Sequence, residues 1–338
     1  MRQKRDGGRP VPAMTVLATI GAFVALQAPV HAQQMPYPPA DPPAKRIVTQ
    51  GLAAPVIDNL FKCGVQVSNH RISAVGTVTA KDGTALTVPA RTDYQTDPKL
   101  ADLYNECSKV TPQTFADVKI VDVPVVEIDK DGEIVTGFII GDNYFQLYIN
   151  GKLVGVDAIP FTPFNSAIVH FRVKRPYTYA FLLVDWEEKL GLGMEKMPTN
   201  DWHAGDGGIF AKFSDGTVTD SSWKAQSYYI APLMQPEDVV EKGSIHDTSK
   251  LGRVHPVAKL PGCKEECYAV HYPIPENWTQ PGFDDGNWPR AYEYTDEDVG
   301  VGSLAGYWRY PEAFLGARWI WTVNLVFDNL VLARKTVR

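Results

Sequence analysis

The sequence has no long apolar run after residue 26, no excess of positive charge, and only four cysteines among its 338 residues. The one run that approaches a membrane span, residues 14–26, is shorter than the roughly 20 residues that a transmembrane helix needs. The net charge of −6 argues against nucleic acid or an anionic membrane surface as a partner. Neither a Gly-x-Ser-x-Gly elbow nor a His-Glu-x-x-His motif occurs, so two common hydrolase signatures are excluded.

The first 32 residues are expected to be a secretory signal peptide that is removed from the chain. Four basic residues precede the apolar run, and Val30-His31-Ala32 supplies small residues at the two positions that a signal peptidase reads. Because this leader also holds one acid, its removal leaves 306 residues with a net charge of −9. The mature chain is therefore expected to be periplasmic or secreted and soluble, with one large core or two modest ones.

The four cysteines of an exported chain are expected to form disulfides, because that compartment is oxidising. We favour the pairing within each region, which joins Cys63 to Cys107 and Cys263 to Cys267. The two other connectivities of four cysteines stay open at this stage.

The chain is expected to divide into four parts, which are a signal peptide (1–32), a Pro-rich linker (33–55), a small disulfide-tied α+β region (56–117) and a mainly β region (118–338). In the third part, the Asp82-Gly83 turn predicts a hairpin of residues 72–79 against residues 85–88. A short helix is expected to follow over residues 98–109.

From residue 118 onward the sequence predicts antiparallel strands. Asx-Gly pairs supply the positive φ values that two-residue hairpins need, and they recur at Asp131-Gly132, Asn150-Gly151 and Asp215-Gly216. Around the second pair, Phe145, Leu147 and Ile149 alternate with other side chains, as in a strand with one buried face. Strands at this spacing without helical repeats indicate an antiparallel β-sandwich or jelly roll.

Three segments resemble the galactose-binding-like jelly-roll domains that are found beside bacterial glycosidases. They are the strand-turn-strand of residues 142–155, an acidic-Trp corner over residues 278–291 that contains Phe283-Asp-Asp-Gly-Asn-Trp288, and a closing segment over residues 318–334. The corner usually precedes the hairpin in those domains and follows it here, so the strand order is permuted or two sandwiches are interleaved. The resemblance, which covers residues 118–338 in patches, implies a non-catalytic glycan-binding module and allows for a structural Ca²⁺.

All eight tryptophans lie between Trp186 and Trp321, so this half of the chain has the larger core or presents indoles to a ligand. A sugar site needs an aromatic plane together with acidic or amide side chains that pair with hydroxyls. Two segments combine these residue types and give the candidate ligand-binding residues Trp186, Glu187, Asp201, Trp202, His203 and Asp206. Glycines at 205, 207 and 208 permit close approach of the backbone to a ligand or a sharp turn. Burial in the core is the alternative role for any one of the candidates.

A competing interpretation comes from Cys263, Cys267 and His271. Their Cys-x3-Cys-x3-His spacing resembles the loop of the binuclear copper centre in cytochrome oxidase subunit II and nitrous oxide reductase. The resemblance implies copper bound by these three side chains, because soft sulfur and imidazole suit copper. The family loop has a methionine where this chain has Ile274, and a Cys263–Cys267 disulfide explains the same thiols without metal. A further histidine ligand would come from His246 or His255.

A third interpretation is a secreted hydrolase built on the same sandwich, with His203 as the base and Asp201 or Asp206 orienting it. No catalytic motif supports it. The favoured interpretation is an exported non-catalytic protein that binds a glycan or another small extracytoplasmic ligand.

Overall fold

The computed structural model describes residues 45–63, 72–159, 165–196, 202–252, 266–301 and 305–338. The chain from residue 43 onward forms one compact unit. The predicted signal peptide, Asp201, His255 and Cys263 lie outside the described residues.

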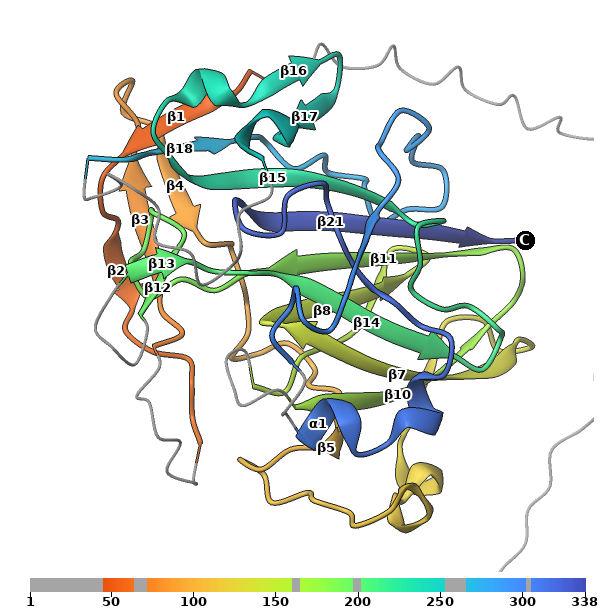
Figure 1. The fold of residues 1–338 in the computed structure, drawn as a ribbon. Helices are drawn as coiled ribbons and strands as arrows, with labels where there is room; N and C mark the ends of the chain where they lie inside the picture. Colours follow the sequence, from red (N-terminus) through yellow and green to blue (C-terminus); the bar gives the residue numbers. More distant parts are fainter. Residues whose placement is uncertain (1–44, 64–71, 160–164, 197–201, 253–265, 302–304) are drawn as a thin grey trace, which may run out of the picture. The chain divides into compact units, whose positions relative to one another are not determined.

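The first sheet consists, within those residues, of seven antiparallel strands (Figure 1). In spatial order they are β1 (Ile47–Gln50), β18 (Tyr268–His271), β15 (Lys224–Leu233), β21 (Asp328–Val337), β11 (Tyr177–Val184), β8 (Tyr144–Ile149) and β9 (Lys152–Val156). The longest ladders are those of β21 with its neighbours β11 and β15, where Val, Leu, Ala and aromatic residues alternate between the two faces.

The second sheet follows the order β19 (Tyr292–Tyr294), β20 (Trp319–Trp321), β14 (Gly208–Phe213), β7 (Glu133–Asp142), β10 (Ser166–Val173) and β5 (Ala101–Tyr104). These strands are antiparallel to one another, and β6 (Val125–Glu127) adds a parallel pairing to β10.

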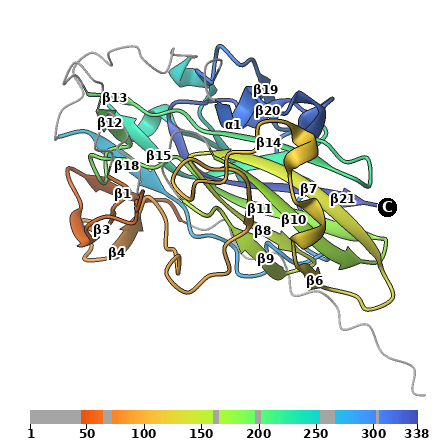
Figure 2. The same ribbon diagram turned by 90° about the horizontal axis from the view of Figure 1, so that it is seen from below.

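The two sheets lie face to face (Figure 2). The core between them is rich in aromatic side chains. Phe171 of β10 meets Tyr179 of β11 edge to face, with ring centroids 5.9 Å apart. Phe213 of β14 lies 4.3 Å from the same tyrosine ring. Contacts of this kind add to the burial of apolar surface that holds two sheets together. The predicted mainly β, antiparallel sandwich is thereby confirmed.

Shorter elements surround the sandwich. The described part of the chain also forms three small sheets. The first consists of β2 (Ala54–Ile57), β3 (Val75–Thr79) and β4 (Ala85–Val88), the second of β12 (Met194–Lys196) and β13 (Trp202–Ala204), and the third of β16 (Val240–Lys242) and β17 (Ile245–Asp247). The helical turns are α1 (Ala305–Trp308), η1 (Phe115–Asp117), η2 (Ile120–Asp122), η3 (Pro236–Asp238), η4 (Ser249–Leu251) and η5 (Pro311–Phe314).

Two of the predicted Asx-Gly hairpins are confirmed. The β8–β9 turn places Asn150 at φ 49° and Gly151 at φ 83°, and the β3–β4 turn places Gly83 at φ 89°. These positive values are the reason why the sequence has Asn and Gly there. At Asp215-Gly216 the chain reverses after β14, and the returning segment makes one isolated bridge, between Lys212 and Val218. Two backbone hydrogen bonds accompany it, from Phe213 to Thr217 and from Thr219 to Ala211.

Two local predictions are wrong. The Asp131-Gly132 turn does not join a paired hairpin, because β6 before it pairs with β10 rather than with β7. The helix expected over residues 98–109 is replaced by strand β5, which buries Leu103 and Tyr104 and pairs with β10. In both cases a distant strand provides hydrogen bonds and burial that local propensity does not foresee.

The N-terminal region is joined closely to the sandwich. Strand β1 falls inside the range expected to be a linker, yet it pairs along its length with β18. Strand β5 belongs to the range expected to be a separate small region, and it forms part of the second sheet. The predicted Cys63–Cys107 disulfide is present. No helix of the described residues is long and apolar enough to cross a membrane.

The acidic-Trp corner is fastened to the sandwich by Arg334 of β21. This side chain is only 1% exposed, and its Nε lies 2.8 Å from Asp285 Oδ2. Its other nitrogens donate to the carbonyl oxygens of Trp278 and Gln280. A buried cation is costly unless its N–H groups are hydrogen-bonded, and the corner provides the acceptors for Arg334. These contacts hold the loop of the corner against β21.

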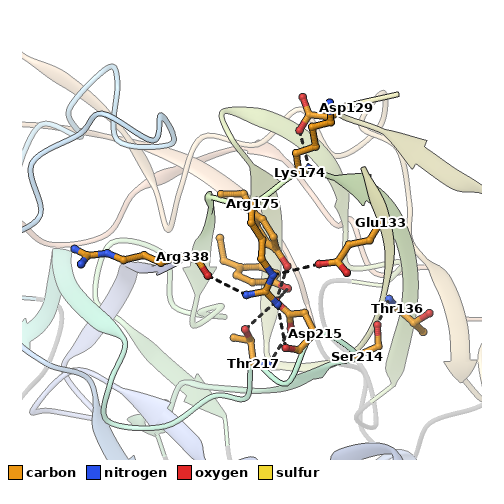
Figure 3. A network of polar contacts seen from close by, with 11 residues as sticks. Asp129, Glu133, Thr136, Lys174, Arg175, Ser214, Asp215, Thr217 and Arg338 are labelled. Atoms are coloured by element: carbon orange, nitrogen blue, oxygen red, sulfur yellow. Dashed lines mark hydrogen bonds and ion pairs between the residues drawn. The ribbon is translucent and has the colours of Figure 1, made fainter. Parts of the chain in front are cut away.

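A second polar network joins the β10–β11 turn to the turn that follows β14 (Figure 3). The fully buried Asp215 carboxylate accepts hydrogen bonds from Tyr177, Tyr179 and Thr217. Arg175 adds a donor to the Asp215 carbonyl at 3.3 Å. The network therefore stabilises both turns, neither of which joins two strands that pair with each other over a long ladder.

Candidate functional site

Of the six residues that the sequence suggested as a sugar site, the structure buries three. Trp186 is fully buried, and its ring lies 5.7 Å from that of Tyr144. Glu187 and His203 are buried as well, whereas Trp202 and Asp206 are half-buried. Trp186 is therefore part of the core, where its ring offers no face to a ligand, and the role of the other candidates stays a prediction.

These residues lie in an acidic region just beyond the end of β11. Burial raises the pKa of Asp185 well above its usual range, and the carboxyls of Glu195 and Asp206 add to the rise. Burial also raises the pKa of Glu187 to about 7, although its hydrogen bond from Tyr229, at 2.7 Å, opposes the change. Carboxyls in this state hold protons near neutral pH, which limits their repulsion.

The glycines at 205, 207 and 208 bring the backbone close to protein side chains. A Cβ at Gly205 would come within 2.5 Å of Asp185 Oδ2. Cβ atoms at Gly207 and Gly208 would meet the indoles of Trp321 and Trp319 at 2.2 and 2.8 Å. The glycines thus let this segment lie directly against the core.

The side chains of the copper interpretation are engaged in other contacts. Cys267 is disulfide-bonded. The Nε2 of His271 lies 2.8 Å from Thr49 Oγ1, its ring stacks on Tyr229, and burial lowers its pKa to about 3. His246 stacks on Tyr272 at 3.4 Å. Among the described residues, which do not include Cys263 and His255, no group of three or more His, Cys, Asp or Glu side chains could hold a metal ion.

A better candidate is an open pocket beside β14, β19 and β20, which we call the aromatic pocket. Its volume is about 540 Å³. It is lined by Phe210, Tyr294, Thr295, Asp296, Tyr307, Trp308, Pro311, Phe314, Gly316, Ala317, Arg318 and Trp319. Six of these twelve are aromatic, and volumes of this size suit small ligands.

The floor of the aromatic pocket is a rigid aromatic group. Phe210 of β14 stacks on Trp319 of β20, with centroids 5.1 Å apart. Tyr307 and Phe314 each lie 5.3 Å from Phe210. Because two of these rings come from paired strands of the second sheet, the floor is held in a fixed arrangement.

Trp308, at the end of α1, forms part of the wall and is 52% exposed. Arg309 lies over its ring at 5.5 Å and also over the ring of Tyr104. Tyr310, the next aromatic residue, is buried and donates its hydroxyl to the Pro112 carbonyl. The two residues after Trp308 are thus anchored to the rest of the protein, while its indole stays accessible to solvent.

The pocket is also lined by polar side chains. Tyr307 Oη donates to Asp296 Oδ1 at 2.6 Å. Burial, followed by this hydrogen bond, raises the pKa of Tyr307, so the hydroxyl stays protonated and keeps donating. Arg318 is exposed, and its backbone is fixed by hydrogen bonds with Thr219. The pocket therefore combines an exposed indole, a carboxylate and a guanidinium.

Sequence reasoning missed this pocket. The concentration of tryptophans in the second half of the chain pointed to it in general terms, and the segment Tyr307-Trp308-Arg309-Tyr310 holds three aromatic residues beside an arginine. Which indole is exposed depends on the packing of α1 and η5 against β14, and no local pattern reports that.

Comparisons with protein families, with curated proteins and with solved structures find no match to this chain. The functional assignment consequently depends on the geometry of the site.

Proposed function

We propose that this chain is an exported, non-catalytic carbohydrate-binding protein with a galactose-binding-like jelly roll, and that its ligand occupies the aromatic pocket. Two facing antiparallel sheets and the Asn150-Gly151 hairpin are compatible with that fold. The Cys63–Cys107 disulfide supports export, because such bonds persist in oxidising compartments.

The observation that carries the proposal is the exposure of Trp308 beside the pocket. An indole is costly to leave in water, and a large exposed aromatic residue next to a pocket is typical of a binding surface. Its apolar face suits the C–H face of a pyranose ring. Asp296 and Arg318 provide an acceptor and donors for the hydroxyl groups on the ring's edge.

The test is binding of the purified chain to a glycan array, followed by calorimetric titration with the best oligosaccharide. Trp308→Ala should weaken binding at least tenfold, equivalent to about 1.4 kcal/mol, because it removes the stacking surface. Its thermal midpoint should stay close to that of the unmodified protein, since half of the side chain already lies in solvent.

Trp202→Ala provides the matched control, because this half-buried indole belongs to the other candidate region and lies under the Lys189 ammonium group. Binding should persist in this variant. Loss of binding in Trp202→Ala with retention in Trp308→Ala would move the site to the region predicted from the sequence. Absence of binding to every saccharide tested would contradict the proposed function.

A further inference from the structure

We infer that the saccharide bound in the aromatic pocket is acidic, and that Arg318 pairs with its carboxylate. This inference rests on the proposed function and specifies the class of ligand that the same pocket takes.

The first observation concerns the partners of Arg318. Arg318 lines the pocket, and the one hydrogen bond of its guanidinium within the described residues goes from Nη1 to the adjacent carbonyl of Ala317, at 3.0 Å. No carboxylate of those residues lies within ion-pair distance of it. Other arginines of the chain are paired, as Arg172 is with Glu127 and Arg334 with Asp285. Arg318 thus keeps most of its five N–H donors available.

Three acids of β19 and the segment that follows it have donors of their own. Asp296 accepts from the Tyr307 hydroxyl, and Asp298 accepts from both the backbone and the hydroxyl of Thr295. Glu293 accepts from the backbone N–H of Ser221. These interactions direct each carboxylate toward a local partner, and Arg318 is left, among the described residues, as a charged donor in the pocket without a carboxylate partner.

The third observation is that Arg318 is positioned before any ligand arrives. Its N–H donates to the Thr219 carbonyl at 2.8 Å, and its own carbonyl accepts from Thr219 Oγ1 at 2.7 Å. The next residue, Trp319, begins β20 and forms part of the pocket floor. A guanidinium held on a fixed backbone loses little freedom when it forms a two-point contact with a carboxylate.

Together these features match the groups of a uronic acid residue, which are a pyranose ring, its hydroxyls and a carboxylate. The pyranose ring would stack on Trp308, a ring hydroxyl would donate to Asp296, and the C6 carboxylate would accept from Arg318 in a fork-like contact. A neutral hexose offers a hydroxymethyl group at that position, which leaves the charged donor without its best acceptor.

The experiment compares uronic acid oligosaccharides with their methyl esters by calorimetric titration of the full chain. Esterification removes the negative charge and keeps the ring, so the difference in affinity between acid and ester measures the contribution of the charged carboxylate. We expect the acid to bind about 10- to 100-fold more tightly than the ester, the range for a hydrogen bond to a charged group. Arg318→Gln should lower the affinity for the acid to that for the ester, and Arg318→Lys should retain part of the preference.

Arg290→Gln is the control, because this arginine does not line the pocket, and it should leave the preference unchanged. Equal affinity for acid and ester in the unmodified protein, with binding lost in Trp308→Ala, would overturn the inference and leave the proposed function intact. An Arg318→Gln variant that weakens acid and ester equally would also overturn it. If neither acid nor neutral saccharides bind, the proposed function itself fails.

Discussion

The most specific prediction concerns Asp157, a fully buried carboxyl at the end of β9. Its Oδ1 accepts from Asn165 Nδ2 at 2.8 Å and from the backbone N–H of Ile159 at 3.1 Å. Its Oδ2 is buried and has no hydrogen-bond partner among the residues that the structure describes. Burial raises the pKa of this group to about 8, from the 3.8 of a solvated aspartate, because the charged form would lose its hydration.

The sign of the effect on stability follows from proton binding. Between about pH 4 and pH 8 the folded state keeps this proton and the unfolded state has lost it. The free energy of unfolding therefore falls as pH rises through this window, by about 1.4 kcal/mol per pH unit from this one group. Below the window both states are protonated and the penalty is absent, and above it the penalty is complete.

Asp157→Asn removes the titration and keeps the acceptor that Asn165 and Ile159 use. We expect the slope of the free energy of unfolding against pH to become less steep by about 1.4 kcal/mol per pH unit between pH 5 and pH 7, a difference of about 3 kcal/mol over the interval. Urea unfolding followed by tryptophan fluorescence at several pH values measures it. Asp131→Asn, at a carboxylate that is 80% exposed, is the control and should leave the slope unchanged. An unchanged slope in Asp157→Asn would refute the reasoning.

Three further predictions concern stability and use urea unfolding at constant pH. Replacing Cys63 and Cys107 together by Ser should cost about 2–4 kcal/mol, because the disulfide closes a loop with a sequence separation of 44, and unchanged stability would show that the disulfide contributes nothing. Asp285→Ala should cost about 3–5 kcal/mol, since it leaves the buried Arg334 charge without its acid, and a cost below about 1 kcal/mol would contradict the fastening of the corner. Asp215→Asn should cost about 1–3 kcal/mol by replacing an acceptor of three hydroxyl groups with an amide, whereas a neutral effect would mean that the network rearranges easily.

The local part of the fold was predictable from the sequence. Asn150-Gly151 and Asp82-Gly83 encode their turns through backbone conformations that few other residues adopt, so the sequence pattern and the structure agree there. The alternation in β8 likewise predicted its buried residues Phe145, Leu147 and Ile149, but Gln146, on the face expected to be exposed, is buried as well.

The non-local part was not predictable. Strand β1 pairs with β18, more than 200 residues away, and β6 and β5 both pair with β10 across long stretches of chain. Nothing in a short segment encodes which distant edge it will join. The same limit explains the site, because Trp186 and Trp308 are chemically identical, and only the packing of the whole sandwich buries one and exposes the other.

The central place of β21 in the first sheet has a consequence for biosynthesis. This strand, formed by residues 328–337, lies between β11 and β15 and contributes the longest ladders to both. Until it emerges during translation, the two halves of the sheet have no partner in the middle and present open, apolar edges. A nascent chain stopped before residue 328 should therefore be unable to close its core and should depend on chaperones, whereas loss of the peripheral β2–β4 sheet would leave both main sheets paired.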